Sequence, residues 1–306
     1  MAKLFILCAV NLLTSGAAAP ANSPFFAYYS ANLSATPWVS LFQADTVGDA
    51  AAAFSSFKVP SMLLLYDALF TTIPGRMILR ADFSLRLQAL LAQAAPLLSS
   101  GAILGLNLGD ELVWNCLSQD NLTVATEAVR AACPRGQKGC LVWYNEAAVF
   151  RAGAFKDSCG NANDAFRVPP ALDWFSVDIY HMDGIVQGWV QEFVAGFYSK
   201  YIFPLLSPGQ KAVLVPGSYG SDVNHYPNGT YVCDRACYDA MIAHDAADFH
   251  AWATADTRIA AVMPWNWNGC PSCNGSRWTP PHTCCMDELG TKTMPQAAAA
   301  WKALFG

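Results

Sequence analysis

The chain has 306 residues, of which 54% are hydrophobic and only 13% are charged, and its formal net charge is -5. This composition excludes a disordered chain and allows one large apolar core. The acidic balance and the lack of basic clusters argue against nucleic acid or an anionic membrane as partner, so a neutral ligand is expected.

The N-terminus has the pattern of a signal peptide. A Lys-containing start precedes an apolar stretch over residues 4–13, and small residues follow at 15–19. We expect residues 1–19 to be a signal peptide and residues 20–306 to form a single secreted domain. The apolar stretch is too short for a permanent anchor, and no later run reaches the roughly 18 apolar residues that a membrane span needs.

Short apolar segments recur along the rest of the chain, and helical patterns separate most of them. A spacing of roughly 30 to 40 residues per unit is typical of strand-helix repetition, and eight units match a (β/α)8 TIM barrel of the α/β class. The expected strands are Phe25–Ser30, Trp38–Gln43, Ser61–Asp67, Ala102–Glu111, Cys140–Glu146, Trp174–His181, Ala212–Ser218 and Ile259–Trp267. The expected helices are Asp82–Leu98, Asn121–Cys133, Trp189–Phe203, Asp234–Ala253 and Pro295–Phe305. The alternative is a doubly wound open sheet, but no Gly-rich nucleotide-binding loop follows the first strand.

Cysteine usage agrees with an oxidising compartment. Of the 11 cysteines, one (Cys8) lies in the expected signal peptide, and the even remainder predicts up to five disulfides that pin the loops. The longest such loop is expected after the eighth strand, over residues 269–286. A zinc site at Cys270-x-x-Cys273 is the alternative there, but disulfides are favoured, and neither a metal nor a cofactor is expected. N-glycosylation is predicted at four sequons, Asn32, Asn121, Asn228 and Asn274.

The fourth expected strand ends in two adjacent acids, Asp110 and Glu111. Barrel enzymes carry their catalytic groups at the carboxyl ends of the strands. Side chains alternate along a strand, which separates Leu104, Leu106 and Leu108 from Gly105, Asn107, Gly109 and Glu111. We expect the leucines to pack under helices and Glu111 to point into the barrel mouth with Asp110 beside it. The alternative is a solvated acidic turn.

The other strand ends are rich in acids, amides and aromatic residues. In the sixth strand, alternation directs Asp178 and Tyr180 inward. Several carboxylates at one mouth suit hydrolysis of glycosidic bonds, and flat rings suit the C–H faces of sugars. We expect catalysis by Glu111, Asp110, Asp178 and Glu146, and substrate binding by Tyr180, Tyr219, Trp265, Trp267, Asn145 and Tyr66. Three other tryptophans are expected in the core, namely Trp38, Trp143 and Trp174.

Residues 106–116, which read Leu-Asn-Leu-Gly-Asp-Glu-Leu-Val-Trp-Asn-Cys, resemble the fourth-strand motif of family 20 β-N-acetylhexosaminidases. In that family the Glu is the general acid/base, and the preceding Asp orients the acetamido group of the substrate, whose oxygen attacks the anomeric carbon. The resemblance implies these roles for Glu111 and Asp110. It also implies that a tyrosine from a later strand end, Tyr180 or Tyr219, holds the acetamido oxygen.

Other barrel mechanisms match the residues less well. Family 18 chitinases carry a spaced acidic series on this strand, and here Asn107 and Gly109 occupy two of its positions. Retaining enzymes with a second Glu on the seventh strand are disfavoured because residues 213–218 contain none. Pairing of Glu111 with Glu146 or Asp178 stays open, and the separation of the two carboxylates would decide between retention and inversion.

The sequence therefore predicts a secreted, monomeric glycosidase that acts on an oligosaccharide, a polysaccharide or a glycoconjugate. A non-catalytic carbohydrate-binding barrel is the alternative from another class. An esterase or lyase that uses His181 or His225 has little support, because the nearest match to a Gly-x-Ser-x-Gly elbow, at residues 216–220, begins with proline.

Overall fold

Eight parallel strands form one sheet in the computed structural model, which describes residues 24–29, 33–147, 155–156, 162–163, 166–180, 189–221, 235–265 and 288–305. The strands are β1 (Phe25–Phe26), β2 (Phe42–Ala44), β3 (Ser61–Leu64), β6 (Ile103–Asp110), β7 (Leu141–Ala147), β10 (Trp174–Ile179), β11 (Lys211–Pro216) and β13 (Ile259–Val262). Their order across the sheet, β1-β13-β11-β10-β7-β6-β3-β2, follows the chain around a ring.

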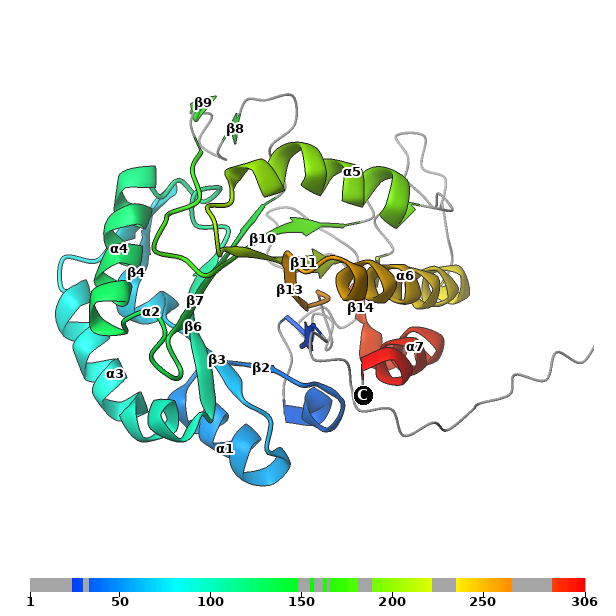
Figure 1. Ribbon diagram of the computed structural model, residues 1–306, viewed down its shortest axis with the longest axis horizontal. Coiled ribbons are helices and arrows are strands. Elements are labelled where there is room, and N and C mark those ends of the chain that lie inside the picture. Colours follow the sequence, from blue (N-terminus) through cyan, green and yellow to red (C-terminus); the bar gives the residue numbers. More distant parts are fainter. Residues whose placement is uncertain are drawn as a thin grey trace, which may run out of the picture.

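The two edge strands of this sheet meet. The backbone N–H groups of Ser40 and Leu41 donate to the carbonyl oxygen of Phe26 at 2.9 and 3.0 Å. The sheet therefore curls until β2 joins β1, and the helices lie outside it (Figure 1). This confirms the predicted (β/α)8 barrel, and the open doubly wound sheet is wrong.

Helices follow most of the strands and cover the outer face of the sheet. They are α1 (Val47–Phe57), α3 (Phe83–Ser100), α4 (Gln119–Ala132), α6 (Arg235–Ala255) and α7 (Pro295–Phe305). Between β10 and β11, π-helical turns at Val190–Val194 and Tyr198–Ile202 flank the short α5 (Ala195–Phe197). Helix α1 was not predicted, although the reciprocal hydrogen bonds of Thr46 and Asp49 form the capping box that marks a helix start.

Smaller elements occupy the loops. After β3 the chain forms α2 (Tyr66–Leu69) and an antiparallel hairpin of β4 (Phe70–Ile73) and β5 (Arg76–Leu79). Two further pairs are β8 (Phe155–Lys156) with β9 (Ala162–Asn163), and β12 (Tyr219–Ser221) with β14 (Glu288–Gly290). Short 3₁₀ turns lie at Leu33–Trp38, Phe203–Leu205 and Thr291–Thr293.

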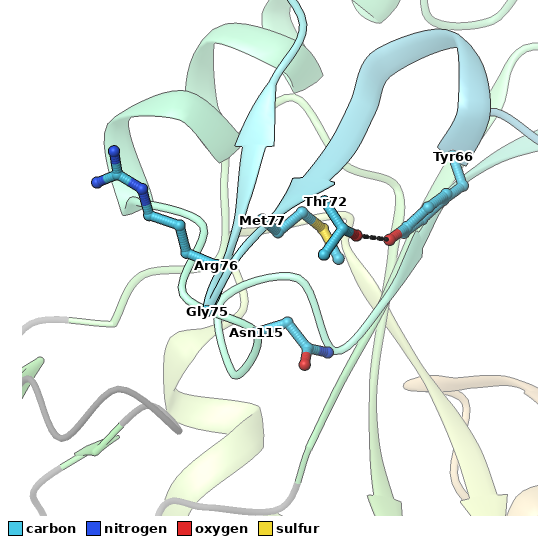
Figure 2. A pocket seen from close by; sticks show the side chains of 6 residues that line it. All are labelled: Tyr66, Thr72, Gly75, Arg76, Met77 and Asn115. Atoms are coloured by element: carbon cyan, nitrogen blue, oxygen red, sulfur yellow. Dashed lines mark hydrogen bonds between the residues drawn. The ribbon is translucent and has the colours of Figure 1, made fainter. Parts of the chain in front are cut away.

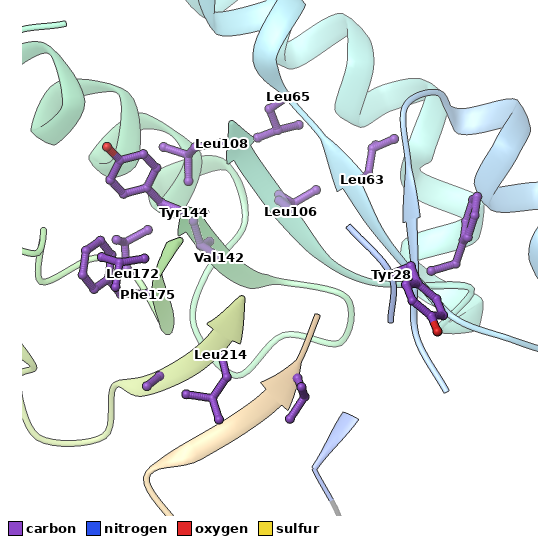
Figure 3. Close-up of a cluster of buried hydrophobic side chains, with 14 of the residues drawn as sticks. Tyr28, Leu63, Leu65, Leu106, Leu108, Val142, Tyr144, Leu172, Phe175 and Leu214 are labelled. Carbon is purple, nitrogen blue, oxygen red and sulfur yellow. The ribbon is translucent and has the colours of Figure 1, made fainter. Parts of the chain in front are cut away.

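The core has two layers, one on each face of the sheet. Leu63, Leu106, Val142, Phe175 and Leu214 pack under the helices (Figure 3). A smaller inner layer fills the barrel with side chains of the opposite strand parity, among them Ala27, Leu41, Met62, Trp143, Trp174 and Val213. Alternation of side chains along each strand produces this division, and it decides which strand-end residues reach the mouth.

Several predicted strand limits are wrong. Trp38 lies in a 3₁₀ turn and is half-buried, and the second strand begins only at Phe42. The third strand stops at Leu64, so that Tyr66 begins helix α2. Leu104 packs with the inner layer and not with the other leucines, because one extra residue at the start of β6 shifts its register against β3. Trp143 and Trp174 are buried in the core, as predicted.

One disulfide of the predicted set joins described residues, Cys133 at the end of α4 to Cys140 before β7. Cys116 is also disulfide-bonded. The predicted signal peptide and the loop at 269–286 lie outside the described residues. Among the helices that the structure describes, none combines the length and the apolar character that crossing a membrane requires.

Candidate active site

A β-bulge at the end of β6 brings both acids of the Asp110–Glu111 pair to the barrel mouth. Asn107 pairs with Trp143 but Asp110 pairs with Asn145, so β6 contains one residue more than β7 over this stretch. Gly109 supplies the backbone for the bulge with φ 148°, a value that other residues rarely adopt, and its N–H donates to Asn107 Oδ1 at 3.0 Å. Regular alternation would have directed Asp110 toward the helices.

A chain of buried hydrogen bonds holds the carboxylates in place. The indole N–H of Trp143 donates to Ser176 Oγ (2.9 Å), and this hydroxyl donates to Asn145 Oδ1 (2.5 Å). The Asn145 side-chain amide then donates to Asp110 Oδ1 and to Asp178 Oδ1, each at 2.7 Å. Because every member is partnered, the amide presents its two N–H bonds to the carboxylates of β6 and β10 in a fixed orientation.

Glu111 lies between these groups on a constrained backbone. Its φ of 48° is in the left-handed region, and its carbonyl oxygen accepts from the backbone and side-chain N–H groups of Asn115 at 2.8 and 2.9 Å. Burial and the nearby Asp110 carboxylate raise the pKa of Glu111 to about 7, although a hydrogen bond with Asp178 opposes the shift. A half-buried carboxyl group with such a pKa can hold a proton at neutral pH and release it.

Asp110 and Asp178 are affected in the same direction. Burial raises the pKa of Asp110, and hydrogen bonding to Asn145 opposes the rise. Burial and the charges of Asp110 and Glu111 raise the pKa of Asp178, against hydrogen bonds from Asn145 and Tyr180. Three carboxyl groups this close cannot all ionise, so the site retains protons at a pH where free carboxylic acids have lost theirs.

Glu146 does not join this group. It is fully buried, with the strand parity of Val142 and Tyr144, and its carboxylate accepts from the backbone N–H groups of Val113 (3.0 Å), Trp114 (3.2 Å) and Ala147 (2.8 Å). It also accepts from the Tyr144 hydroxyl. The structure therefore places Glu146 as the anchor of the loop that follows Glu111 and not across the mouth from it.

The structure describes the side chains of some of the predicted sugar-binding residues, and these lie at different points. Tyr180 hydrogen-bonds to Asp178. The half-buried Trp265 lies against Tyr29, with the ring centres 5.5 Å apart. Tyr66 lines a separate cavity beside β6. Tyr219 lies in β12, but its side chain is not described, and Trp267 and His181 lie outside the described residues.

Tyr29 at the end of β1 was missed by the sequence analysis. Its buried hydroxyl lies beside Asp110 and Asn107 without completing a well-aligned hydrogen bond to either. Strand alternation would have identified it, because Tyr29 shares the parity of Ala27 in the inner layer.

Among the described residues, no cluster of His, Cys, Asp or Glu is arranged to hold a metal ion.

No protein-family model matches the chain, and no curated protein does. Solved structures do match, at low sequence identity. The FMN-binding β-glucuronidase from Facaelibacterium prausnitzii L2-6 superposes with a TM-score of 0.56 and 11% identity over 93% of this chain and 44% of that one. An endo-laminarinase from Formosa Hel1_33_131 gives 0.53 and 10% over 80% and 78%.

The GH2 β-galacturonidase from Eisenbergiella tayi has a TM-score of 0.51 and 10% identity over 89% of this chain. The chain spans less than half the length of that enzyme, 46%. At these identities the likeness concerns the fold. The chain has the (β/α)8 barrel fold found in these glycoside hydrolases.

Proposed function

We propose that the chain is a secreted glycosidase in which Glu111 donates the proton to the leaving group. The observation that carries this proposal is the group of three carboxylates at the mouth, in which Glu111 is half-buried beside Asp110 and Asp178. Hydrolysis of a glycosidic bond needs a carboxylic acid that is still protonated at working pH. The fold and the expected signal peptide support the same proposal.

The contacts of Asp178 favour a substrate-assisted reaction. Asp178 hydrogen-bonds to Glu111, and its Oδ1 accepts from the Asn145 side chain at 2.7 Å. Burial also raises the pKa of Asp178, which reduces the negative charge that an attack on the anomeric carbon needs. We therefore assign the attack to the substrate, as the resemblance to family 20 implies.

In this reaction the acetamido oxygen of an N-acetylhexosaminide attacks the anomeric carbon. The glycosidic C–O bond breaks, and its oxygen takes the proton of Glu111. Asp110 orients the acetamido group, and Tyr180 holds its oxygen. Water then opens the cyclic intermediate and gives a proton to the Glu111 carboxylate, which restores the acid. These side chains come from Asp110 at the end of β6, from Glu111 directly after it and from Tyr180 directly after β10.

Fluorination of the substrate tests whether the substrate or the protein supplies the nucleophile. Aryl N-acetylglucosaminides with zero to three fluorines on the acetamido methyl are expected to be hydrolysed progressively more slowly, because fluorine withdraws electrons from the attacking oxygen. The trifluoro compound should lose about 100-fold or more in kcat. Equal rates across the series, or faster hydrolysis of the matching aryl glucoside, would assign the nucleophile to the protein. No hydrolysis of any aryl glycoside would favour a carbohydrate-binding barrel without catalysis.

The pH profile should report the environment of Glu111. A proton donor works below its pKa, so kcat/KM of the wild-type chain should fall above pH 7, about tenfold per unit. Asp110→Asn removes a charge that raises the pKa of Glu111, and the alkaline limb should move to lower pH. Asp178→Asn is the matched comparison, because the new amide can still donate a hydrogen bond to Glu111. Its alkaline limb should therefore move less than that of Asp110→Asn. An unmoved limb in Asp110→Asn contradicts the assignment.

A further inference from the structure

A cavity of about 390 Å³ lies beside the candidate active site. Its walls come from α2, from the β4–β5 hairpin and from the loop after β6, and its lining residues are Tyr66, Thr72, Gly75, Arg76, Met77 and Asn115 (Figure 2). Both contributing loops follow carboxyl ends of strands, β3 and β6, so the cavity lies on the same face of the barrel as Glu111.

The cavity shares a wall with the catalytic loop. The Asn115 carbonyl oxygen accepts from the Met77 backbone N–H at 2.8 Å, which ties the hairpin to this loop, and Asn115 itself holds the Glu111 carbonyl oxygen. On the other side the Tyr66 ring packs against the bulge, where a methyl group added to Gly109 would come within 3.1 Å of its Cδ2. The cavity is therefore formed in advance and held at a fixed position relative to Glu111.

The lining residues have the chemistry of a site for a neutral sugar. The half-buried Tyr66 offers a ring face for C–H contacts, and its hydroxyl lies 3.4 Å from Thr72 Oγ1. The side chain of Asn115 adds an amide oxygen to the lining, while its Nδ2 donates to the Glu111 carbonyl oxygen. Arg76 also lines the cavity, and its side chain extends away from Tyr66 and Thr72 (Figure 2).

We propose that this cavity is a second sugar-binding subsite, which takes a neutral sugar unit of an oligosaccharide next to the unit that is cleaved. The proposal rests on the proposed function and adds to it the substrate class. The natural substrate is then an oligosaccharide or a glycan chain and not an isolated monosaccharide glycoside. The β4–β5 hairpin, an insertion between β3 and α3, is the element that creates this preference for length.

The test measures the binding of oligosaccharides to the Glu111→Gln variant, which lacks the proposed proton donor and should therefore not hydrolyse them. By calorimetry, neutral N-acetylated and non-acetylated gluco-oligosaccharides of one to four units are compared. In at least one series, affinity should rise tenfold or more when the second or third unit is added. Tyr66→Ala and Thr72→Val should each reduce this gain severalfold. Thr71→Val, the same change on the neighbouring residue of β4, is the control and should keep the whole gain.

The outcomes separate this proposal from the proposed function. Hydrolysis of an aryl glycoside without any gain of affinity with length overturns the subsite and leaves the glycosidase intact. Gain with length that depends on Tyr66 and Thr72, in a wild-type chain that hydrolyses nothing, supports the subsite and overturns the glycosidase. Loss of the gain in Thr71→Val as well, or no binding of any oligosaccharide by a protein with an unchanged melting curve, also overturns the subsite.

Discussion

Glu111→Gln is expected to lower kcat/KM on an aryl N-acetylglucosaminide by about 10² to 10⁴-fold, which is the usual contribution of a general acid. Glutamine keeps the size of the side chain and can still hydrogen-bond to Asp178, but it has no proton to give to the leaving oxygen. The loss should be smallest for substrates whose leaving group is a very acidic phenol, because such a group departs without protonation. A comparison of nitrophenyl and alkyl glycosides measures this dependence.

The control for this substitution is Glu127→Gln, the same change on the exposed face of helix α4. It should leave kcat/KM within twofold of the wild-type value. Both variants should melt within a few degrees of the wild-type chain. If Glu111→Gln retains full activity, or loses the same factor on activated and unactivated leaving groups, Glu111 is not the proton donor.

Asn145→Asp is expected to be the second most damaging change at the mouth. It replaces a buried amide, which donates to Asp110 and Asp178 at 2.7 Å each, by a carboxyl group placed against two others. Hydrogen bonds to charged groups contribute roughly 1.5 to 3 kcal/mol each, so the free energy of unfolding at neutral pH should fall by about 3 kcal/mol or more. With the carboxylates no longer held, kcat/KM should fall by about 100-fold.

Ser176→Ala is the graded comparison for Asn145→Asp. It removes the hydroxyl that donates to Asn145 Oδ1 but leaves both contacts of the amide to the carboxylates in place. Ser176→Ala also leaves the buried Trp143 indole N–H without its acceptor, so it should lose roughly 1 to 3 kcal/mol of stability. Chemical denaturation and kinetics together should rank the two variants, with Ser176→Ala retaining most of the activity and Asn145→Asp losing more of both activity and stability. An Asn145→Asp chain as stable and active as the wild type would contradict the role of the amide bridge.

Periodicity in the sequence predicted the barrel well because eight apolar segments separated by helices leave few other topologies. Alternation along β10 also predicted the inward position of Asp178, since Phe175, Val177 and Ile179 do pack under the helices. These successes depend on regular strands, in which position along the chain determines the face on which a side chain lies.

Alternation did not predict what happens where strands are irregular. Leu104 and Asp110 both lie at register shifts of β6, and the alternation of apolar and polar residues in the sequence does not predict such a shift. Alternation also did not separate Glu146 from the other strand-end acids. Its burial depends on backbone N–H groups of a loop more than thirty positions earlier in the chain, and a local sequence pattern does not contain such contacts. The β4–β5 hairpin is too short to stand out from the loop around it.

The bulge at Gly109 makes the position of the Asp-Glu pair depend on the number of residues in β6 as well as on their identity. Most strand positions tolerate or reject mutations according to the side chain they carry, whereas insertions and deletions are usually absorbed in loops. Here the number of residues in β6 determines whether Asp110 faces the mouth or the helices. A deletion of one codon within this strand would preserve both acids in the sequence and still remove one of them from the site.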